Sequence, residues 1–83
     1  MALPSAPVTL TVEQIDQLNR KLSNMRHDVN NHLALIVAAA ELIRLSPDKM
    51  RKMTGTLLEQ SPKITDELQK FSAEFEQTLG ITR

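Results

Sequence analysis

The residues with the clearest chemical potential in this 83-residue chain form one short segment, Arg26-His27-Asp28-Val29-Asn30-Asn31-His32-Leu33. It holds both histidines of the chain. An exposed imidazole is largely neutral at pH 7, so a ring nitrogen can act as a nucleophile. Asp28 follows His27 directly, and carboxamides follow three and four residues later. A carboxylate can hold a proton at a ring nitrogen, and a carboxamide can orient a small reactant. The segment therefore indicates a candidate nucleophile at an imidazole.

The two histidines are expected on different sides of a helix. At about 100° of rotation per residue, His32 falls on a seam position about 40° from the centre of an apolar stripe, and His27 falls about 180° from that centre. The neighbours of His27 three and four residues away are small and polar: Ser23, Asn24, Asn30 and Asn31. Serine and asparagine are weaker helix formers than glutamate, lysine or alanine. This surface therefore gives up helix propensity and leaves the His27 ring open to a large partner.

Three further expectations concern the neighbours of these rings. Asn31 shares the face of His27, whereas Asp28 lies about 100° around the helix and is not expected to face that ring. His32 is expected to pack in the dimer seam and form a hydrogen bond across it, with a pH-sensitive seam or a supporting role at the site as the alternative. A zinc site is not expected, because the two histidines lack the i,i+4 spacing of paired zinc ligands. The alternative for His27 is an ordinary surface histidine.

The composition excludes several classes of protein. Only two glycines occur, Gly55 and Gly80, so no glycine-rich phosphate loop can form. No cysteine is present, which rules out disulfides and gives no sign of an oxidising compartment, and we expect a cytoplasmic protein. Ten basic residues balance ten acidic ones, and aromatic residues make up 2%, which argues against a nucleic-acid partner. No apolar run approaches the ~20 residues that span a bilayer, so no membrane insertion is expected.

Two long helices must position the histidine segment. Thr11 and Gln14 have the spacing of a capping box, and no glycine or proline interrupts the sequence from there to Leu45. Ser46-Pro47-Asp48 is expected to cap a second helix that runs from Pro47 to Leu79 and ends at Gly80. The short turn predicts an antiparallel hairpin over residues 11–80, with a disordered tail at 1–10 and a short tail at 81–83. The fold class is all-α.

Heptad spacing defines the faces of both helices. The first stripe comprises Ile15, Leu18, Leu22, Met25, Val29, His32, Ile36, Ala39 and Ile43. The second comprises Met50, Met53, Leu57, Ser61, Ile64, Leu68, Phe71, Phe75 and Leu79. Pro62 falls on the outer side of the second helix, where a kink keeps the phase of the stripe. Because one hairpin leaves apolar surface uncovered, we expect a homodimer that forms a four-helix bundle. The alternative is a monomeric hairpin that docks onto another protein.

The segment around His27 resembles the phosphoacceptor box of sensor histidine kinases. It is closest to the branch in which the box is R-H-D-x-x-N-H-L, shared with the sporulation-type phosphotransferases. The commoner box, H-E/D-x-x-T/N-P-L, is matched at His27, Asp28, Asn31 and Leu33, whereas His32 replaces its proline. The resembling segment covers eight residues, although the expected hairpin architecture extends over most of the chain.

This resemblance implies a dimerisation and phosphotransfer domain of a two-component system. His27 would accept a phosphoryl group from ATP or from a phospho-aspartate, and would pass it to an aspartate of a response-regulator receiver domain. Asp28 would be its acid/base partner, and Asn31 would position a water when the regulator is dephosphorylated. The chain has neither the length nor the glycines for the family's ATP-binding domain, so ATP and Mg²⁺ would act only through a separate kinase domain, with no cofactor bound here. The alternative is a dimerisation or docking adaptor without phosphoryl chemistry.

Overall fold

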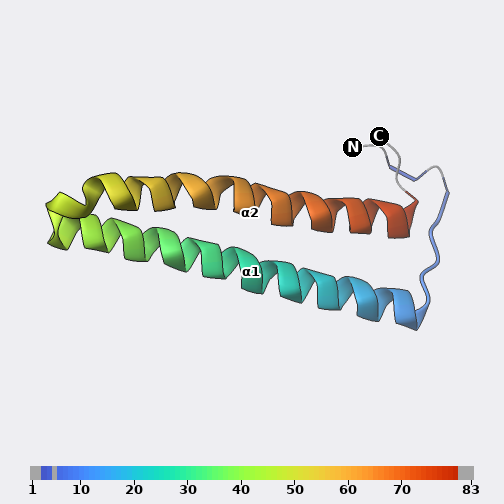
Figure 1. Cartoon of the computed structure of the whole chain (residues 1–83). Coiled ribbons are helices and arrows are strands. Elements are labelled where there is room, and N and C mark those ends of the chain that lie inside the picture. The colour runs from blue at the N-terminus through green and yellow to red at the C-terminus, as the bar shows by residue number, and fades with distance from the viewer. Residues whose placement is uncertain (1–2, 5, 81–83) are drawn as a thin grey trace.

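The computed structural model describes residues 3–4 and 6–80 and contains two long antiparallel helices (Figure 1). Helix α1 spans Val12–Leu45, and helix α2 spans Met50–Leu79. A single 3₁₀ turn, η1 (Pro47–Lys49), joins them. The described residues contain no strand, so the predicted all-helical hairpin is confirmed. None of the described helices has the length and apolarity needed to cross a membrane.

The start of α1 follows the predicted capping box. The Thr11 hydroxyl accepts a hydrogen bond from the Gln14 amide at 3.1 Å, and the Thr11 amide donates to the Gln14 side-chain oxygen at 2.9 Å. These two bonds satisfy backbone and side-chain groups at the helix end, where no intrahelical partner exists. Residues 3–4 and 6–10 form neither helix nor strand. Residues 1–2, 5 and 81–83 of the two predicted tails lie outside the described residues.

The turn between the helices differs from the prediction. The Ser46 side chain forms no capping hydrogen bond, and α2 begins at Met50 rather than at Pro47. The Ser46 carbonyl instead accepts the Lys49 amide at 2.9 Å, while the Ser46 amide donates to the Leu42 carbonyl at 2.8 Å. The tight 3₁₀ turn thus satisfies these backbone groups without a side-chain cap.

Helix α2 contains Pro62 and ends at Gly80, as predicted. Pro62 is exposed and the helix continues on both sides of it. Proline has no amide hydrogen, so the carbonyl of Leu58 has no intrahelical donor at this point. Gly80 adopts a left-handed conformation with φ 68°, and its amide donates to the Gln77 carbonyl at 3.2 Å. Glycine suits this position because it has no side chain to clash there.

The interior of this hairpin is thin. The molecule measures 57 × 24 × 12 Å, which corresponds to one layer of two helices. Ala39, at 2% exposure, is the only apolar residue of the described part that is fully buried. Every residue of the stripe predicted for α1 is at least half-buried except Ile15. A single layer therefore leaves much apolar side-chain surface uncovered.

The prediction for α2 is wrong at three stripe positions: Met50, Ser61 and Leu68 are exposed. In their region Gln60 is buried and Glu67 is half-buried, so α2 is turned relative to the predicted stripe. The Gln60 side chain forms a hydrogen bond with His32 on α1. Ser61, and not Gln60, was the residue expected to face α1. The Gln60–His32 hydrogen bond thus lies inside the hairpin, while Leu68 is exposed.

Candidate functional site

His27 lies near the middle of α1 and points into solvent. Its side chain is 75% exposed, as expected from its position opposite the apolar stripe. The helix continues without interruption for several turns on both sides, so the backbone holds the ring at a fixed place on the surface. The long helix therefore presents an imidazole on a regular, rigid support.

The side chains of Asn31 and Asp28 both lie near the Nδ1 atom of His27. The Asn31 Nδ2 atom is 3.5 Å from Nδ1, as expected for residues four apart on one helical face. The Asp28 Oδ1 atom is 3.7 Å from the same nitrogen, and this side chain is 49% exposed. We had expected Asp28 to face away from His27, and this is wrong at the side-chain level.

Asn31 and Asp28 favour opposite protonation states of the His27 Nδ1 atom. The Asn31 amide group donates, so it requires a lone pair on Nδ1, whereas the Asp28 carboxylate accepts and requires a hydrogen there. With the hydrogen on Nδ1, the neutral ring has its lone pair on Nε2. Nε2 has no hydrogen-bond partner among the described residues. The arrangement therefore leaves one ring nitrogen open and places a proton acceptor beside the other.

His32 lies in the seam between the helices. Its Nδ1 atom is 2.8 Å from the Gln60 Oε1 atom, and Gln60 is only 3% exposed. Because a carboxamide oxygen only accepts, Nδ1 of His32 carries the hydrogen in this bond. His32 was expected to bond across a dimer seam, whereas its partner here is Gln60 of the same hairpin. Gln60 was missed in the sequence, although an uncharged polar residue beside the α2 stripe is a usable signal.

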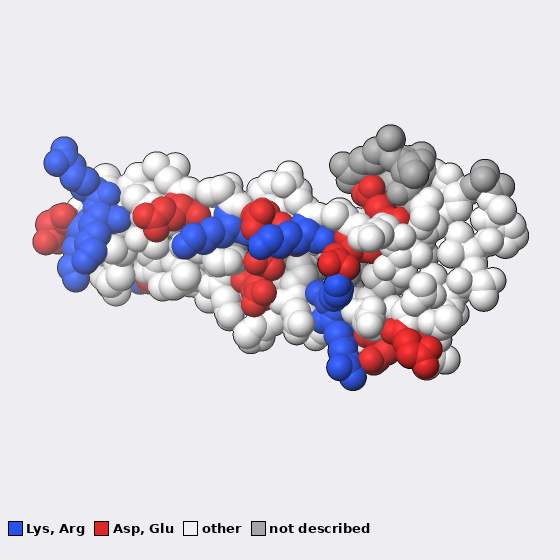
Figure 2. Space-filling model, turned by 45° about the vertical axis from the view of Figure 1, so that its right-hand side comes forward, with Lys and Arg blue, Asp and Glu red and all other residues white. Residues whose placement is uncertain are grey.

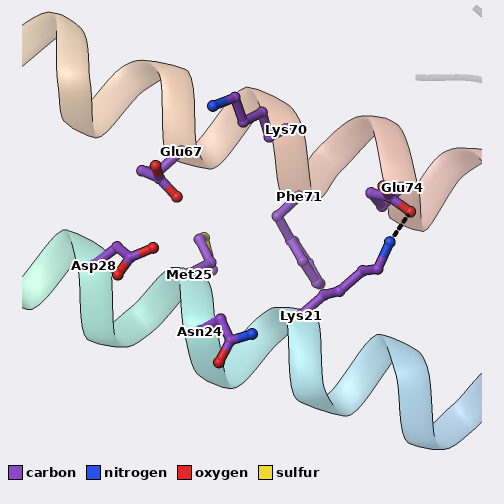
Figure 3. Close-up of a pocket in the computed structure, with 8 residues that line it drawn as sticks. All are labelled: Lys21, Asn24, Met25, Asp28, Glu67, Lys70, Phe71 and Glu74. Atoms are coloured by element: carbon purple, nitrogen blue, oxygen red, sulfur yellow. Dashed lines mark ion pairs between the residues drawn. The ribbon is translucent and has the colours of Figure 1, made fainter.

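An open groove of about 210 Å³ lies between the helices beside Asp28 (Figure 3). Met25 and Phe71 supply its apolar part. A salt bridge between Lys21 Nζ and Glu74 Oε2, 2.5 Å long, crosses from α1 to α2 at one end. The groove is lined by Lys21, Asn24, Met25, Asp28, Glu67, Lys70, Phe71 and Glu74. It defines one broad side of the hairpin, which we call the groove side.

Lys70 links this groove electrostatically to the site. A hydrogen bond to Asp66 is the main factor that raises the pKa of Lys70, and the Asp66 charge adds to it. The charge of Glu67 raises the pKa further, and desolvation lowers it. The charge of Asp28 also raises the pKa of Lys70, but it is the smallest of these contributions. The sequence alone does not predict this proximity, because it depends on the register between α1 and α2.

The described residues contain no cluster of three or more histidine, cysteine, aspartate or glutamate side chains suited to a metal ion. Comparisons with family models, with curated proteins and with solved structures found no match. The features of the molecule that bear on its function are the arrangement of His27, Asp28 and Asn31 and the surfaces around them.

Proposed function

We propose that this chain is a histidine phosphoacceptor and dimerisation module of a two-component signalling system. The observation that supports this most is the environment of His27, whose open Nε2 atom lies opposite an Nδ1 atom flanked by Asp28 and Asn31. A phosphoryl donor is bulky and charged, and it requires an accessible nucleophile with a proton acceptor at the second ring nitrogen. The open Nε2 atom supports the first requirement, and we assign the second to the Asp28 carboxylate, 3.7 Å from Nδ1.

The transfer proceeds by displacement at phosphorus. The lone pair on His27 Nε2 attacks the phosphorus of a phospho-aspartate on a receiver domain, an N–P bond forms, and the P–O bond to the aspartate breaks. The aspartate leaves as a carboxylate. Asp28 stabilises the positive charge that develops on the ring by accepting the Nδ1 hydrogen in a hydrogen bond. In the reverse direction the receiver carboxylate attacks the phosphorus and the neutral imidazole leaves.

The alternative phosphoryl donor is ATP bound to a separate kinase domain. Mg²⁺ would be held by that domain and the nucleotide. We assign to Asn31 the positioning of the water molecule that hydrolyses the phospho-aspartate of a receiver domain. Its carboxamide shares the face of His27, so it can reach a water beside the phosphoryl group. No nucleic acid enters this scheme, and the partners are proteins.

Dimerisation into a four-helix bundle is the second part of the proposal. Exposed apolar side chains lie on the side of the hairpin opposite the groove, and we call this surface the apolar face: Leu33, Val37, Leu58 and Leu68. Leu33 lies about 140° around α1 from Asp28, which borders the groove. A second copy packed on the apolar face buries these residues and leaves His27 open.

The test is phosphotransfer between this chain and a phosphorylated receiver domain encoded beside its gene. We expect a label on the chain that is lost in acid and kept in base, as for phosphohistidine. His27→Gln should take up no label, and His32→Gln should take it up as the wild type does, with both variants shown to be helical by circular dichroism. Equal labelling of His27→Gln would contradict the proposal.

The competing function is a dimerisation or docking adaptor without phosphoryl chemistry. The large exposed apolar surface of a single hairpin favours it. In that case His27→Ala leaves the cellular phenotype intact, whereas a charge on the apolar face, as in Leu68→Asp, abolishes it. Comparison of these two variants in the same genetic background separates the two functions.

A further inference from the structure

Arg26 lies on the exposed surface of α1, directly before His27. Neighbouring residues of a helix are about 1.5 Å apart along its axis and about 100° apart around it. Arg26 and Asp28 therefore flank His27 on opposite sides of the helix surface, a cation on one side and an anion on the other. An arginine has a long, flexible stem, so its guanidinium can reach a group attached to the next side chain.

Arg26 differs from the other cations of α1 in having no carboxylate partner. Each of the others forms a salt bridge: Arg20, Lys21 and Arg44. Arg26 forms none with any residue of the described part. Its neighbours three and four positions away along the helix are uncharged: Leu22, Ser23, Val29 and Asn30. The helix therefore places a positive charge beside His27 and gives it no carboxylate at helical spacing.

A phosphoryl group at His27 would need a cation close to it. Such a group carries a charge of about −1.5 to −2 at pH 7. The Asp28 carboxylate, 3.7 Å from Nδ1 of the ring, repels its oxygens. The neighbours of His27 three and four positions away are uncharged: Ser23, Asn24, Asn30 and Asn31. A guanidinium is planar and donates paired hydrogen bonds that match two phosphoryl oxygens, so Arg26 is suited to offset this repulsion.

We propose that Arg26 binds the phosphoryl group at His27. As the N–P bond forms at Nε2, the guanidinium donates hydrogen bonds to two non-bridging oxygens, and it neither gains nor loses a proton. This contact keeps the phosphorus beside Nε2 and offsets the negative charge of Asp28. The inference rests on the proposed function, because it requires a phosphoryl group at His27.

The probe is phosphoramidate, a small phosphoryl donor that needs no receiver or kinase domain. Its P–N bond breaks, the protonated amine leaves as ammonia, an N–P bond forms at the imidazole, and the ring releases its Nδ1 proton to the solvent. All chains carry His32→Gln, so that His27 is the one imidazole available. We expect Arg26→Gln to be labelled at least about tenfold more slowly than this parent chain. Arg26→Lys should keep most of the rate, because it keeps the charge.

A second measurement does not depend on the labelling rate. In ³¹P spectra of the labelled chain, the phosphoryl group takes up a proton at a characteristic pH. Arg26→Gln should move this midpoint to higher pH, because loss of the guanidinium disfavours the dianion. The difference between the two chains should shrink in about 1 M sodium chloride, which screens exposed charges.

Arg51→Gln, near the hairpin turn, is the matched control. Arg51 is exposed and forms no ion pair with the described residues, so its loss changes the net charge equally and should alter neither measurement. The inference would be overturned by an equal effect of Arg51→Gln, by unchanged values in Arg26→Gln, or by an unlabelled His27. A change of oligomeric state in Arg26→Gln would also overturn it, since Arg26 would then belong to the contact between copies.

The two donors separate this inference from the proposed function. If a phosphorylated receiver domain labels the parent chain and phosphoramidate shows no effect of Arg26, the inference fails and the proposed function stands. If phosphoramidate shows the effect of Arg26 and no receiver domain labels the chain, the contact between Arg26 and the phosphoryl group stands and the proposed function fails.

Discussion

At the scale of single residues, the two histidines differ in exposure and in hydrogen-bond partners because they lie on different sides of the same helix. His27 is open to solvent, and its Nδ1 atom lies near Asp28 and Asn31. The Nδ1 atom of His32 is fixed by a 2.8 Å hydrogen bond to Gln60 in the seam. Five residues separate them, which corresponds to about 140° around the helix. The same side chain is therefore presented to partners in one case and used for packing in the other.

Replacement of Asp28 tests the proton acceptor at His27. Asp28→Asn removes the charge that favours a hydrogen on Nδ1, and we expect phosphotransfer to fall by about 10²-fold, within the usual range for acid–base groups. Single-turnover transfer from a phosphorylated receiver domain measures this. Asp66→Asn, which removes a comparable carboxylate from α2, should leave the rate unchanged. An unaltered rate in Asp28→Asn would remove Asp28 from the mechanism.

The seam pair of His32 and Gln60 has a predicted effect on stability. Gln60→Ala leaves a half-buried imidazole N–H without its acceptor, and we expect a loss of about 1–3 kcal/mol in the free energy of unfolding. The double variant His32→Leu/Gln60→Leu should recover most of that loss, because neither polar group remains. Urea unfolding at a fixed protein concentration gives both values. A loss in the double variant larger than in Gln60→Ala would contradict the assigned role of this bond.

At the scale of elements, α1 and α2 differ in how well their sequences suit a helix. Helix α1 has a complete capping box and no glycine or proline. Helix α2 contains Gly55 and Pro62, and its first turn has no side-chain cap. The Thr65 hydroxyl donates to the Ser61 carbonyl at 3.1 Å, beside Pro62. The first half of α2 therefore depends more than α1 on contacts with its partner helix.

The two glycines predict opposite effects of alanine. At Gly55 an added methyl group meets nothing within 4 Å, so Gly55→Ala should stabilise the hairpin by about 0.5–1 kcal/mol through helix propensity. At Gly80 the space is also open, but φ is 68°, so Gly80→Ala should destabilise the fold. Thermal unfolding of the two variants at equal concentration checks the signs. A stabilising Gly80→Ala would show that the left-handed cap is not formed.

At the scale of the whole molecule, one hairpin is too thin to cover its apolar residues. Only Ala39 among the described apolar residues is fully buried, while leucines remain exposed on both broad sides. Charged side chains form a band along the length of the view in Figure 2, bordered by uncharged surface. A domain of this size has little apolar burial to offset chain entropy. The folded chain is therefore expected to depend on association.

This dependence predicts a concentration-dependent melting temperature, because a dimer that dissociates on unfolding is stabilised by mass action. Leu58→Asp, which places a charge on the apolar face, should lower the melting temperature and give a monomer in sedimentation at micromolar concentration. Gln69→Asp adds the same charge to another exposed position of α2 and should change neither quantity appreciably. A wild-type monomer with a melting temperature independent of concentration would contradict dimerisation.

The sequence by itself determined the local features of this protein. Thr11 with Gln14 started α1, Gly80 ended α2, and the heptad spacing of α1 placed His32 inside and His27 outside. These features depend on hydrogen bonds and rotations within a few residues, so they can be derived from one chain segment at a time. The pairing of Asn31 with His27 belongs here as well, since residues four apart on a helix are neighbours in every register.

Only the tertiary structure decided how the helices face each other. The rotation of α2 placed Gln60 against His32 and turned Leu68 outward, and the register brought Glu67 and Lys70 to the groove beside Asp28. The heptad spacing of α2 predicted a different rotation, with Ser61 and Leu68 inward, so its own sequence does not select the observed one. The choice depends on satisfying Gln60 and His32 together, and these two groups are 28 residues apart in the chain.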